Sequence, residues 1–234
     1  MLLPPGCFES EISIAELEQH GSDAAAAQAL GLAFGPQLAR AFPKRRLEFL
    51  AGRLCAQRGL EQAGYPGHAV IGIGEQRAPV WPVGFSGSIA HGSGRAWAVV
   101  AAQARYRGLG IDLETIVDPA TARKLWSTVL RPFERERARP DALSEEQFLS
   151  LVFSAKESLF KCLYPITRAR FGFLDAELVH LDLQANLLRL SLRASLSAEF
   201  QPESIFDIGF ELGAEIRTFC ALHCHVTESG VWPT

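Results

Sequence analysis

Two carboxylates, Asp112 and Glu114, follow an apolar run in the stretch GIDLE, residues 110–114. On a β-strand, side chains two residues apart point to the same face of the sheet. Both carboxylates would therefore face one way, while Leu113 would face the other, buried side. The stretch is either an ordinary strand end or one half of a metal site, and these five residues do not decide between the two.

A third carboxylate, Glu157, lies within a helix expected over residues 144–164. Phe153 lies four residues before it and Phe160 three after it, so its neighbours on the helix surface are aromatic. A carboxylate in such surroundings is costly unless it is paired or bound to a metal. Lys161, four residues further on, offers the simpler alternative of a helical Glu–Lys pair.

Taken together, Asp112, Glu114 and Glu157 predict a cation site in a cleft. Three carboxylates that lie close together repel one another and need a cation to offset their charge. Oxygen ligands without His or Cys suit Mg²⁺ or Mn²⁺. Mg²⁺ in proteins is commonly bound together with a phosphate group of the substrate. The three carboxylates therefore raise the question of where a phosphate would bind.

A site that binds phosphate should contain basic residues. Residues 40–58 contain six basic residues and one acidic residue, although the net charge of the whole chain is −3. Arg45 and Arg53 are eight residues apart and would share one helical face. Arg77 and His91 add candidate phosphate donors on loops. The alternative for the basic segment is a solvated helix face, and for His91 a structural loop residue.

The elements that must position these residues follow from the apolar periodicity. Helices are expected over residues 42–64 and 144–164, and the second opens with the capping-box pair Ser144 and Gln147. The remaining segments are expected as a short helix at 22–34, a loop at 77–88, and strands at 68–74, 95–104, 108–114, 176–181, 187–193, 205–212 and 216–226.

Helix followed by strands, twice, predicts an α+β fold of two similar halves. We place the halves at residues 1–111 and 112–234, with a cleft at their junction, where ligands commonly bind.

Composition excludes several classes of protein. The chain has 234 residues, 48% of them hydrophobic, and its net charge of −3 argues against a general nucleic-acid binder. The first residues lack a signal-peptide pattern, and no apolar run approaches the ~18 residues of a membrane span. The five cysteines are odd in number and fit a reducing cytoplasm, where we expect the protein, better than a disulfide framework.

The cysteine and histidine cluster CALHCH, residues 220–225, has two interpretations. One is a zinc site. The other, which we favour, is a strand with small buried thiols, on which Cys220 and Cys224 face one way while His223 and His225 face the other.

The stretch GIDLE, followed by FSAKESLFK at residues 153–161, resembles the paired signature of the 4′-phosphopantetheinyl transferases. PKRRLEFLAGR, RAPVWPVGFSGSIAHG and YPITRARFGFLDA look like the enterobactin-synthase type of that family, which is related to the surfactin-synthetase activators. The matches run from about Pro43 to Ala176 in the family's order.

The resemblance implies two similar α/β halves related by pseudo-twofold symmetry, with coenzyme A bound in the cleft between them. It implies an enzyme of the holo-[acyl-carrier-protein] synthase type, which moves phosphopantetheine from coenzyme A to a serine of an apo carrier protein and releases 3′,5′-ADP. Mg²⁺, or Mn²⁺, would be the cofactor. The partners would be acidic acyl, peptidyl or aryl carriers of fatty-acid, polyketide or nonribosomal peptide biosynthesis, siderophores included.

By position, the resemblance assigns the metal to Asp112, Glu114 and Glu157, and catalysis to Glu157, Lys161 and Asp112. It assigns the 3′-phosphate to Arg45, Arg53 and His91, the adenine to residues 76–79, other phosphates to Lys156 and Lys161, and the pantetheine arm to Phe171. The implied coenzyme A site is therefore Arg45, Arg53, Gln76, Arg77, Ala78, Pro79, Ala90, His91, Asp112, Lys156, Lys161 and Phe171.

Two positions depart from the family pattern. Many relatives have Ser or Thr where this chain has Ala90, so only a backbone N–H is left there. Some have a lysine in the loop where Arg77 is the only cation here. Arg168 and Arg170 are candidates for docking the carrier, with an ordinary charged surface as the alternative. One chain would form a complete site, so a monomer suffices.

Two rival functions use the same residues. One is a non-catalytic module that binds coenzyme A or a nucleotide, with the carboxylates in structural ion pairs. The other is a Mg²⁺-dependent phosphohydrolase, with water as the nucleophile.

Exchanging Leu113 and Glu114 tests the alternation on the GIDLE strand, because it sets the two acids side by side on opposite faces. We expect the variant to lose both Mg²⁺ dependence and the transfer activity that the resemblance implies, whereas Leu113→Ile keeps both. A Mg²⁺ titration of the activity measures this. Full activity in the exchanged variant would contradict the prediction that the two carboxylates act from one face.

Overall fold

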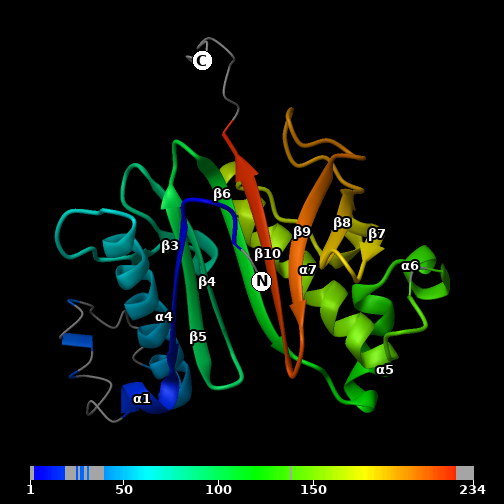
Figure 1. Ribbon diagram of the computed structural model, residues 1–234, viewed down its shortest axis with the longest axis horizontal. Helices are drawn as coiled ribbons and strands as arrows, with labels where there is room; N and C mark the ends of the chain where they lie inside the picture. The colour runs from blue at the N-terminus through cyan, green and yellow to red at the C-terminus, as the bar shows by residue number, and fades with distance from the viewer. Residues whose placement is uncertain are drawn as a thin grey trace.

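The computed structural model describes residues 3–18, 25, 27–28, 31, 40–137 and 139–224 of the chain. They form an α+β fold, as predicted, in which antiparallel sheets are covered by helices (Figure 1). Its strands are β1 (Cys7–Ser13), β2 (Gly72–Ile73), β3 (Pro79–Val80), β4 (Phe85–Gly92), β5 (Arg95–Ala102), β6 (Tyr106–Thr115), β7 (Ala176–Asp182), β8 (Leu187–Leu192), β9 (Ile205–Leu212) and β10 (Glu215–His223).

The described helices are of very unequal length, and two of them carry the site described below. They are α1 (Ile14–Glu18), α4 (Pro43–Gln62), α5 (Pro119–Val129), α6 (Pro132–Arg137) and α7 (Glu145–Thr167). None of the helices in the described ranges is both long and apolar enough to cross a membrane. The short helix predicted at residues 22–34 falls almost entirely outside the described part of the chain.

Two antiparallel sheets lie side by side, with β6 in the middle of the molecule (Figure 1). The first has the strand order β1-β5-β4 and the second β6-β10-β9-β8-β7, while β2 and β3 form a separate small pair. The strand predicted at 68–74 is therefore mostly wrong, because only Gly72 and Ile73 pair. The boundary that we predicted between residues 111 and 112 falls inside β6.

Helix α4 packs on the first sheet. It begins at Pro43, whose fixed φ and missing N–H suit the first turn of a helix. Leu50, Ala56 and Leu60 are fully buried, within one core that also contains alanines and a valine of β5. Gly52 allows the helix to approach the sheet, since a Cβ there would lie 2.7 Å from Cγ2 of Ile89.

Helix α7 packs on the second sheet. Its capping box is formed as predicted: the Ser144 hydroxyl accepts from the Gln147 N–H, and the Gln147 side chain accepts from the Ser144 N–H. The predicted apolar stripe is confirmed, since all its members are buried: Phe148, Leu151, Val152, Ala155, Leu159 and Leu163. The stripe packs against leucines, isoleucines and phenylalanines of β7 to β10.

Two glycines of β6 allow α7 to lie directly on that strand. A Cβ on Gly110 would overlap the carbonyl oxygen of Ser158, and one on Gly108 would lie 2.7 Å from the carbonyl oxygen of Cys162. Both distances are shorter than real Cβ contacts allow. Because residues 108, 110, 112 and 114 share one face of the strand, the surface that receives the helix is the surface that carries the two acids.

A third core fills the opposite face of β6. Ile111 and Leu113 are fully buried there with Trp97 and Val99 of β5 and with Phe219 of β10. The prediction that Leu113 faces the buried side is confirmed. This core joins the two sheets and fixes the direction in which Asp112 and Glu114 point.

Serine side chains join β4 to β6 at the junction of the two sheets. The Ser86 hydroxyl donates to the carbonyl oxygen of Tyr106 at 2.5 Å, and the Ser88 hydroxyl accepts from the Ile111 N–H at 3.1 Å. Gly92 lies so close to β6 that a Cβ there would overlap the carbonyl oxygen of Leu113. The end of β4 is therefore held beside the acidic end of β6.

Gly110→Ala tests the approach of α7 to β6. The added methyl group must displace the α7 backbone, so we expect a loss of about 3 kcal/mol or more in the free energy of unfolding, at the upper end of overpacking effects. Urea denaturation measures it. Gly213→Ala is the matched control, because its Cβ would meet nothing closer than 3.8 Å. Equal stability of the two variants would contradict this account of the β6 glycines.

Candidate functional site

Asp112 and Lys161 form an ion pair between β6 and α7. Lys161 Nζ lies 2.6 Å from Oδ1 of Asp112 and 3.1 Å from the carbonyl oxygen of Ile111. Asp112 is 5% exposed, and its Oδ2 is buried with no hydrogen-bond partner among the described residues. An unpaired, buried carboxylate oxygen costs free energy, so this atom marks a place that suits a cation or a donor.

Glu114 and Glu157 lie near enough to Asp112 and Lys161 for the charges of that pair to influence their pKa values. Burial, reinforced by the charge of Asp112, raises the pKa of Glu114 to about 7. Burial also raises the pKa of Glu157, Lys161 opposes that rise, and Asp112 adds to it. The structure thus brings three carboxylates and one ammonium together where α7 crosses β6. Simple pairing of Glu157 with Lys161, the alternative open to the sequence, does not account for the other two acids.

The donor set of this cluster fits a hard divalent cation. The three acids supply only oxygen, one oxygen is unpaired, and two of the acids hold their charge at a cost that a cation would relieve. In the described ranges, however, no three Asp, Glu, His or Cys side chains are already arranged as metal ligands. The residues are therefore suited to the ion, but their present geometry is not a finished coordination shell.

A basic group lies beside the carboxylates, at the end of β4. Arg45 of α4 donates to Nε2 of His91 at 2.5 Å and to Glu48 at 3.3 Å. Burial and the Arg45 charge lower the pKa of His91, and Lys161 lowers it further. His91 is therefore a neutral ring that accepts from Arg45, and its coupling to Lys161 links the basic group to the acidic one. Ala90, before it, is fully buried and offers no side-chain donor.

Arg53 is a buried cation that no carboxylate in the described part of the chain pairs with. It is 5% exposed, donates to the carbonyl oxygen of Gly72 at 3.1 Å, and stacks on the Phe49 ring at 4.6 Å. Its Nε is buried without a partner among the described residues, and burial lowers its pKa to about 10. A desolvated guanidinium of this kind is suited to an anionic ligand.

The loop at residues 76–79 is held by Arg170, which follows the end of α7. Gln76 and Arg77 have positive φ angles of 53° and 64°, which non-glycine residues adopt at a cost. The guanidinium of Arg170 donates to Oε1 of Gln76. Ala78 and Pro79 follow in extended conformation.

Phe171 lines a cavity of about 180 Å³ next to Glu157. Its ring lies 5.4 Å from that of Phe160, and Phe173 completes the aromatic wall. The cavity is small and largely apolar, so it suits a narrow uncharged chain better than a phosphate.

The ammonium group of Lys156 lies in a buried ion pair, so the phosphate contact that the resemblance implied for it stays a prediction. Its side chain is 1% exposed and its Nζ lies 2.8 Å from Oε2 of Glu134 and 2.8 Å from the carbonyl oxygen of Val129. Sequence reasoning missed Glu134, because the lone signal was an acid within the short segment PFERER.

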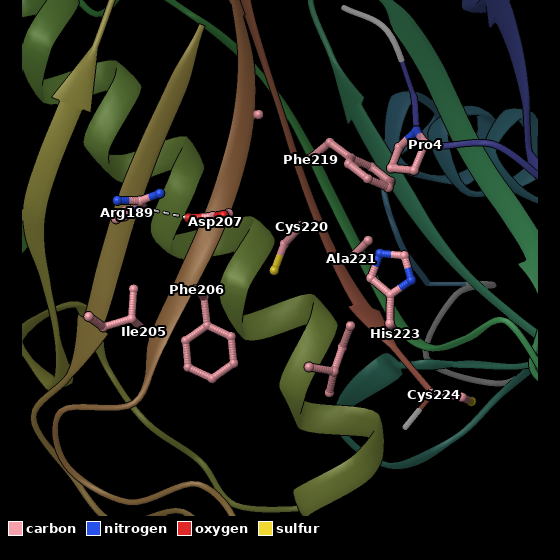
Figure 2. A pocket seen from close by; sticks show the side chains of 12 residues that line it. Pro4, Arg189, Ile205, Phe206, Asp207, Phe219, Cys220, Ala221, His223 and Cys224 are labelled. Atoms are coloured by element: carbon pink, nitrogen blue, oxygen red, sulfur yellow. Dashed lines mark hydrogen bonds and ion pairs between the residues drawn. The ribbon is translucent and has the colours of Figure 1, made fainter. Parts of the chain in front are cut away.

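A larger cavity, of about 680 Å³, lies elsewhere and contains none of the predicted site residues (Figure 2). Arg189 and Asp207, which form an ion pair 2.8 Å apart, are among the residues that line it. His223 and Cys224 lie at one end of it.

The CALHCH segment is a strand as far as His223. Cys220 is buried against Cys162 of α7, whereas the centre of the His223 ring lies 4.6 Å from that of the Tyr106 ring, with the two rings tilted. Cys224 follows the end of the strand and donates to a backbone carbonyl, while His225 lies outside the described residues. The favoured prediction of a strand is confirmed up to that point.

Comparison with known proteins defines the class of protein to which this geometry belongs. The family model described as the 4′-phosphopantetheinyl transferase N-terminal domain matches residues 35–101, and the model for the 4′-phosphopantetheinyl transferase superfamily matches residues 108–216. The chain belongs to the 4′-phosphopantetheinyl transferase superfamily.

Among individual proteins, the chain is similar to enterobactin synthase component D of Escherichia coli K12. The two are 43% identical over 148 residues, which are 63% of this chain and 68% of that protein. It is also 36% identical to the 4′-phosphopantetheinyl transferase Npt of Nocardia iowensis over 60% of this chain and 62% of that protein. It is 35% identical to the 4′-phosphopantetheinyl transferase PptT of Mycobacterium tuberculosis over 61% of this chain and 62% of that protein.

Arg53→Met separates ligand binding from folding. Because the guanidinium is buried without an acid to pair with, we expect the free energy of unfolding in urea to stay within about 1 kcal/mol of wild type or to rise. Binding of 3′,5′-ADP, measured by calorimetry, should weaken by at least about tenfold. Arg58→Met, at an exposed position of the same helix, should change neither. Unchanged nucleotide affinity in Arg53→Met would show that this cation is structural.

Proposed function

We propose that this protein transfers 4′-phosphopantetheine from coenzyme A to a serine hydroxyl of an apo carrier protein and releases 3′,5′-ADP. The observation that carries the proposal is the cluster of Asp112, Glu114, Glu157 and Lys161 where α7 crosses β6. Membership of the superfamily, and relatives named as 4′-phosphopantetheinyl transferases, support the same reaction.

The proposal includes two similar halves, residues 1–111 and 112–234, related by pseudo-twofold symmetry, with coenzyme A between them. In support, each half contains one long helix packed on an antiparallel sheet, and the basic and acidic groups meet near the junction of β4 and β6. The nucleotide end would lie toward Arg45, Arg53 and His91, with the adenine at the 76–79 loop. The pantetheine arm would enter the cavity beside Phe171.

Asp112, Glu114 and Glu157 would hold Mg²⁺, which when bound would neutralise charge on the pyrophosphate. Lys161, held by Asp112, would offset the charge that develops on the leaving phosphate as the P–O bond breaks. The serine oxygen forms the new P–O bond and its proton must leave. Glu157 would accept that proton, and its raised pKa makes it a stronger base than an exposed carboxylate.

The acceptor would be an acidic carrier, drawn by the cations around the site. Arg168 and Arg170 are the candidates for docking it, and Arg170 already reaches across to the 76–79 loop. The similarity to a component of enterobactin synthase favours carriers of nonribosomal peptide and siderophore biosynthesis. Every proposed site residue belongs to one chain, so a monomer would suffice.

The proposed transfer is tested by incubating the protein with coenzyme A, Mg²⁺ and an apo carrier and measuring the mass of the carrier. A gain of about one phosphopantetheine, ~340 Da, supports transfer. No gain with several carriers, together with free hydrolysis of coenzyme A, would instead identify a phosphohydrolase. Binding of coenzyme A without either reaction would identify a binding module.

Glu157→Gln tests the proposed base and metal ligand. The amide keeps the shape of the side chain but cannot accept the proton, so transfer should fall by at least about a hundredfold. The urea midpoint should not fall, since the variant removes a partly buried charge. Glu145→Gln, exposed in the first turn of the same helix, is the control and should transfer normally. Near-normal turnover of Glu157→Gln would refute the role.

A further inference from the structure

Lys156 and Glu134 form a buried ion pair that the proposed reaction does not use. Both oxygens of Glu134 are fully engaged: Oε2 accepts from Lys156 Nζ at 2.8 Å and from the Arg131 N–H at 2.6 Å, and Oε1 accepts from the Leu178 N–H at 2.6 Å. Lys156 also donates to the Val129 carbonyl oxygen at 2.8 Å. Neither side chain is more than 1% exposed.

These contacts tie three separate segments to the turn of α7 that carries Glu157. Val129 is the last residue of α5, Glu134 lies in α6, and Leu178 lies in β7. Lys156 directly precedes Glu157 in the chain. The pair therefore fixes α5, α6 and β7 relative to the proposed base.

The chain between α7 and β7 forms the wall of the aromatic cavity. It contains Phe171 and Phe173, which line the cavity together with Glu157. The Arg131 guanidinium holds this segment too, since it donates to the carbonyl oxygen of Leu174 at 2.5 Å. Arg170, in the same segment, reaches Gln76 of the other half.

We propose that Lys156 and Glu134 are a positioning pair, which fixes residues 168–178 against α7 and so sets the shape of the cavity beside Glu157. The charged groups of the two residues then act on the cavity wall and not on a phosphate, although the Lys156 side chain itself is one of those that line the cavity. The proposal rests on the proposed function, because the cavity is where the pantetheine arm would lie. It gives Lys156 a role different from the phosphate contact that the resemblance implied.

Lys156 cannot serve both roles at once. Moving its ammonium to a phosphate would leave the Glu134 carboxylate buried opposite two backbone donors with no cation. Removing one partner of a buried pair is strongly unfavourable, whereas the intact pair has all its hydrogen bonds satisfied. The ion pair is therefore the stable state, and the phosphate contact would have to break it.

The test compares Lys156→Met, Glu134→Gln and the double variant. Because all three break the same pair, we expect the same defect in each: kcat for transfer lower by about tenfold or more, and KM for coenzyme A within about threefold of wild type. Lys124→Met, exposed on α5, is the control and should match wild type. The proposal is overturned if Glu134→Gln leaves kcat within about twofold of wild type, or if Lys156→Met acts mainly by raising KM for coenzyme A.

Two further measurements keep the test decisive. Hydrogen exchange without substrates should show faster exchange of the backbone amides across 168–178 in the three variants, with β1 unchanged. Unchanged exchange at 168–178 overturns the proposal even if the wild type modifies no carrier.

If the neutral variants do not fold, Glu134→Asp keeps both charges and withdraws the carboxylate by one methylene. It should lower kcat without raising KM, and a wild-type kcat would overturn the pairing.

Discussion

The contact of α7 with β6 is the interaction on which the site depends. Gly108 and Gly110 leave no side chain between the helix backbone and the strand, so the helix lies at a distance that any other residue would forbid. Two residues further along the same face, Asp112 then meets Lys161 at 2.6 Å. Positions that carry no side chain are thus as necessary to the acidic cluster as the acids themselves.

Charge is concentrated in this part of the molecule at a cost to folding. The second oxygen of Asp112 and Nε of Arg53 are both buried without partners among the described residues, and burial raises the pKa of Glu114 to about 7. Such groups reduce stability unless a ligand completes them. Perturbed groups of opposite sign at the edges of one junction are typical of a site built for a charged substrate.

Lys156 and Glu134 show the contrasting case of buried charges that complete each other. Their hydrogen bonds use backbone groups of α5, of β7 and of Arg131 just before α6, so the pair belongs to the framework around the cavity. Both neighbouring residues line the aromatic cavity, but their charged groups have different partners: the Lys156 ammonium pairs with Glu134, while the Glu157 carboxylate interacts with Asp112 and Lys161.

Features that depend on local periodicity could be predicted from the amino-acid sequence. The capping box of α7, its apolar stripe and the opposite directions of Asp112 and Leu113 all follow from the repeat of a helix or a strand, and the structure confirms them. Which charges pair could not be predicted in this way. The strand predicted at 68–74 has only two paired residues, and Lys156 pairs with Glu134. Both outcomes depend on partners that lie far apart in the chain, and a local sequence pattern does not contain them.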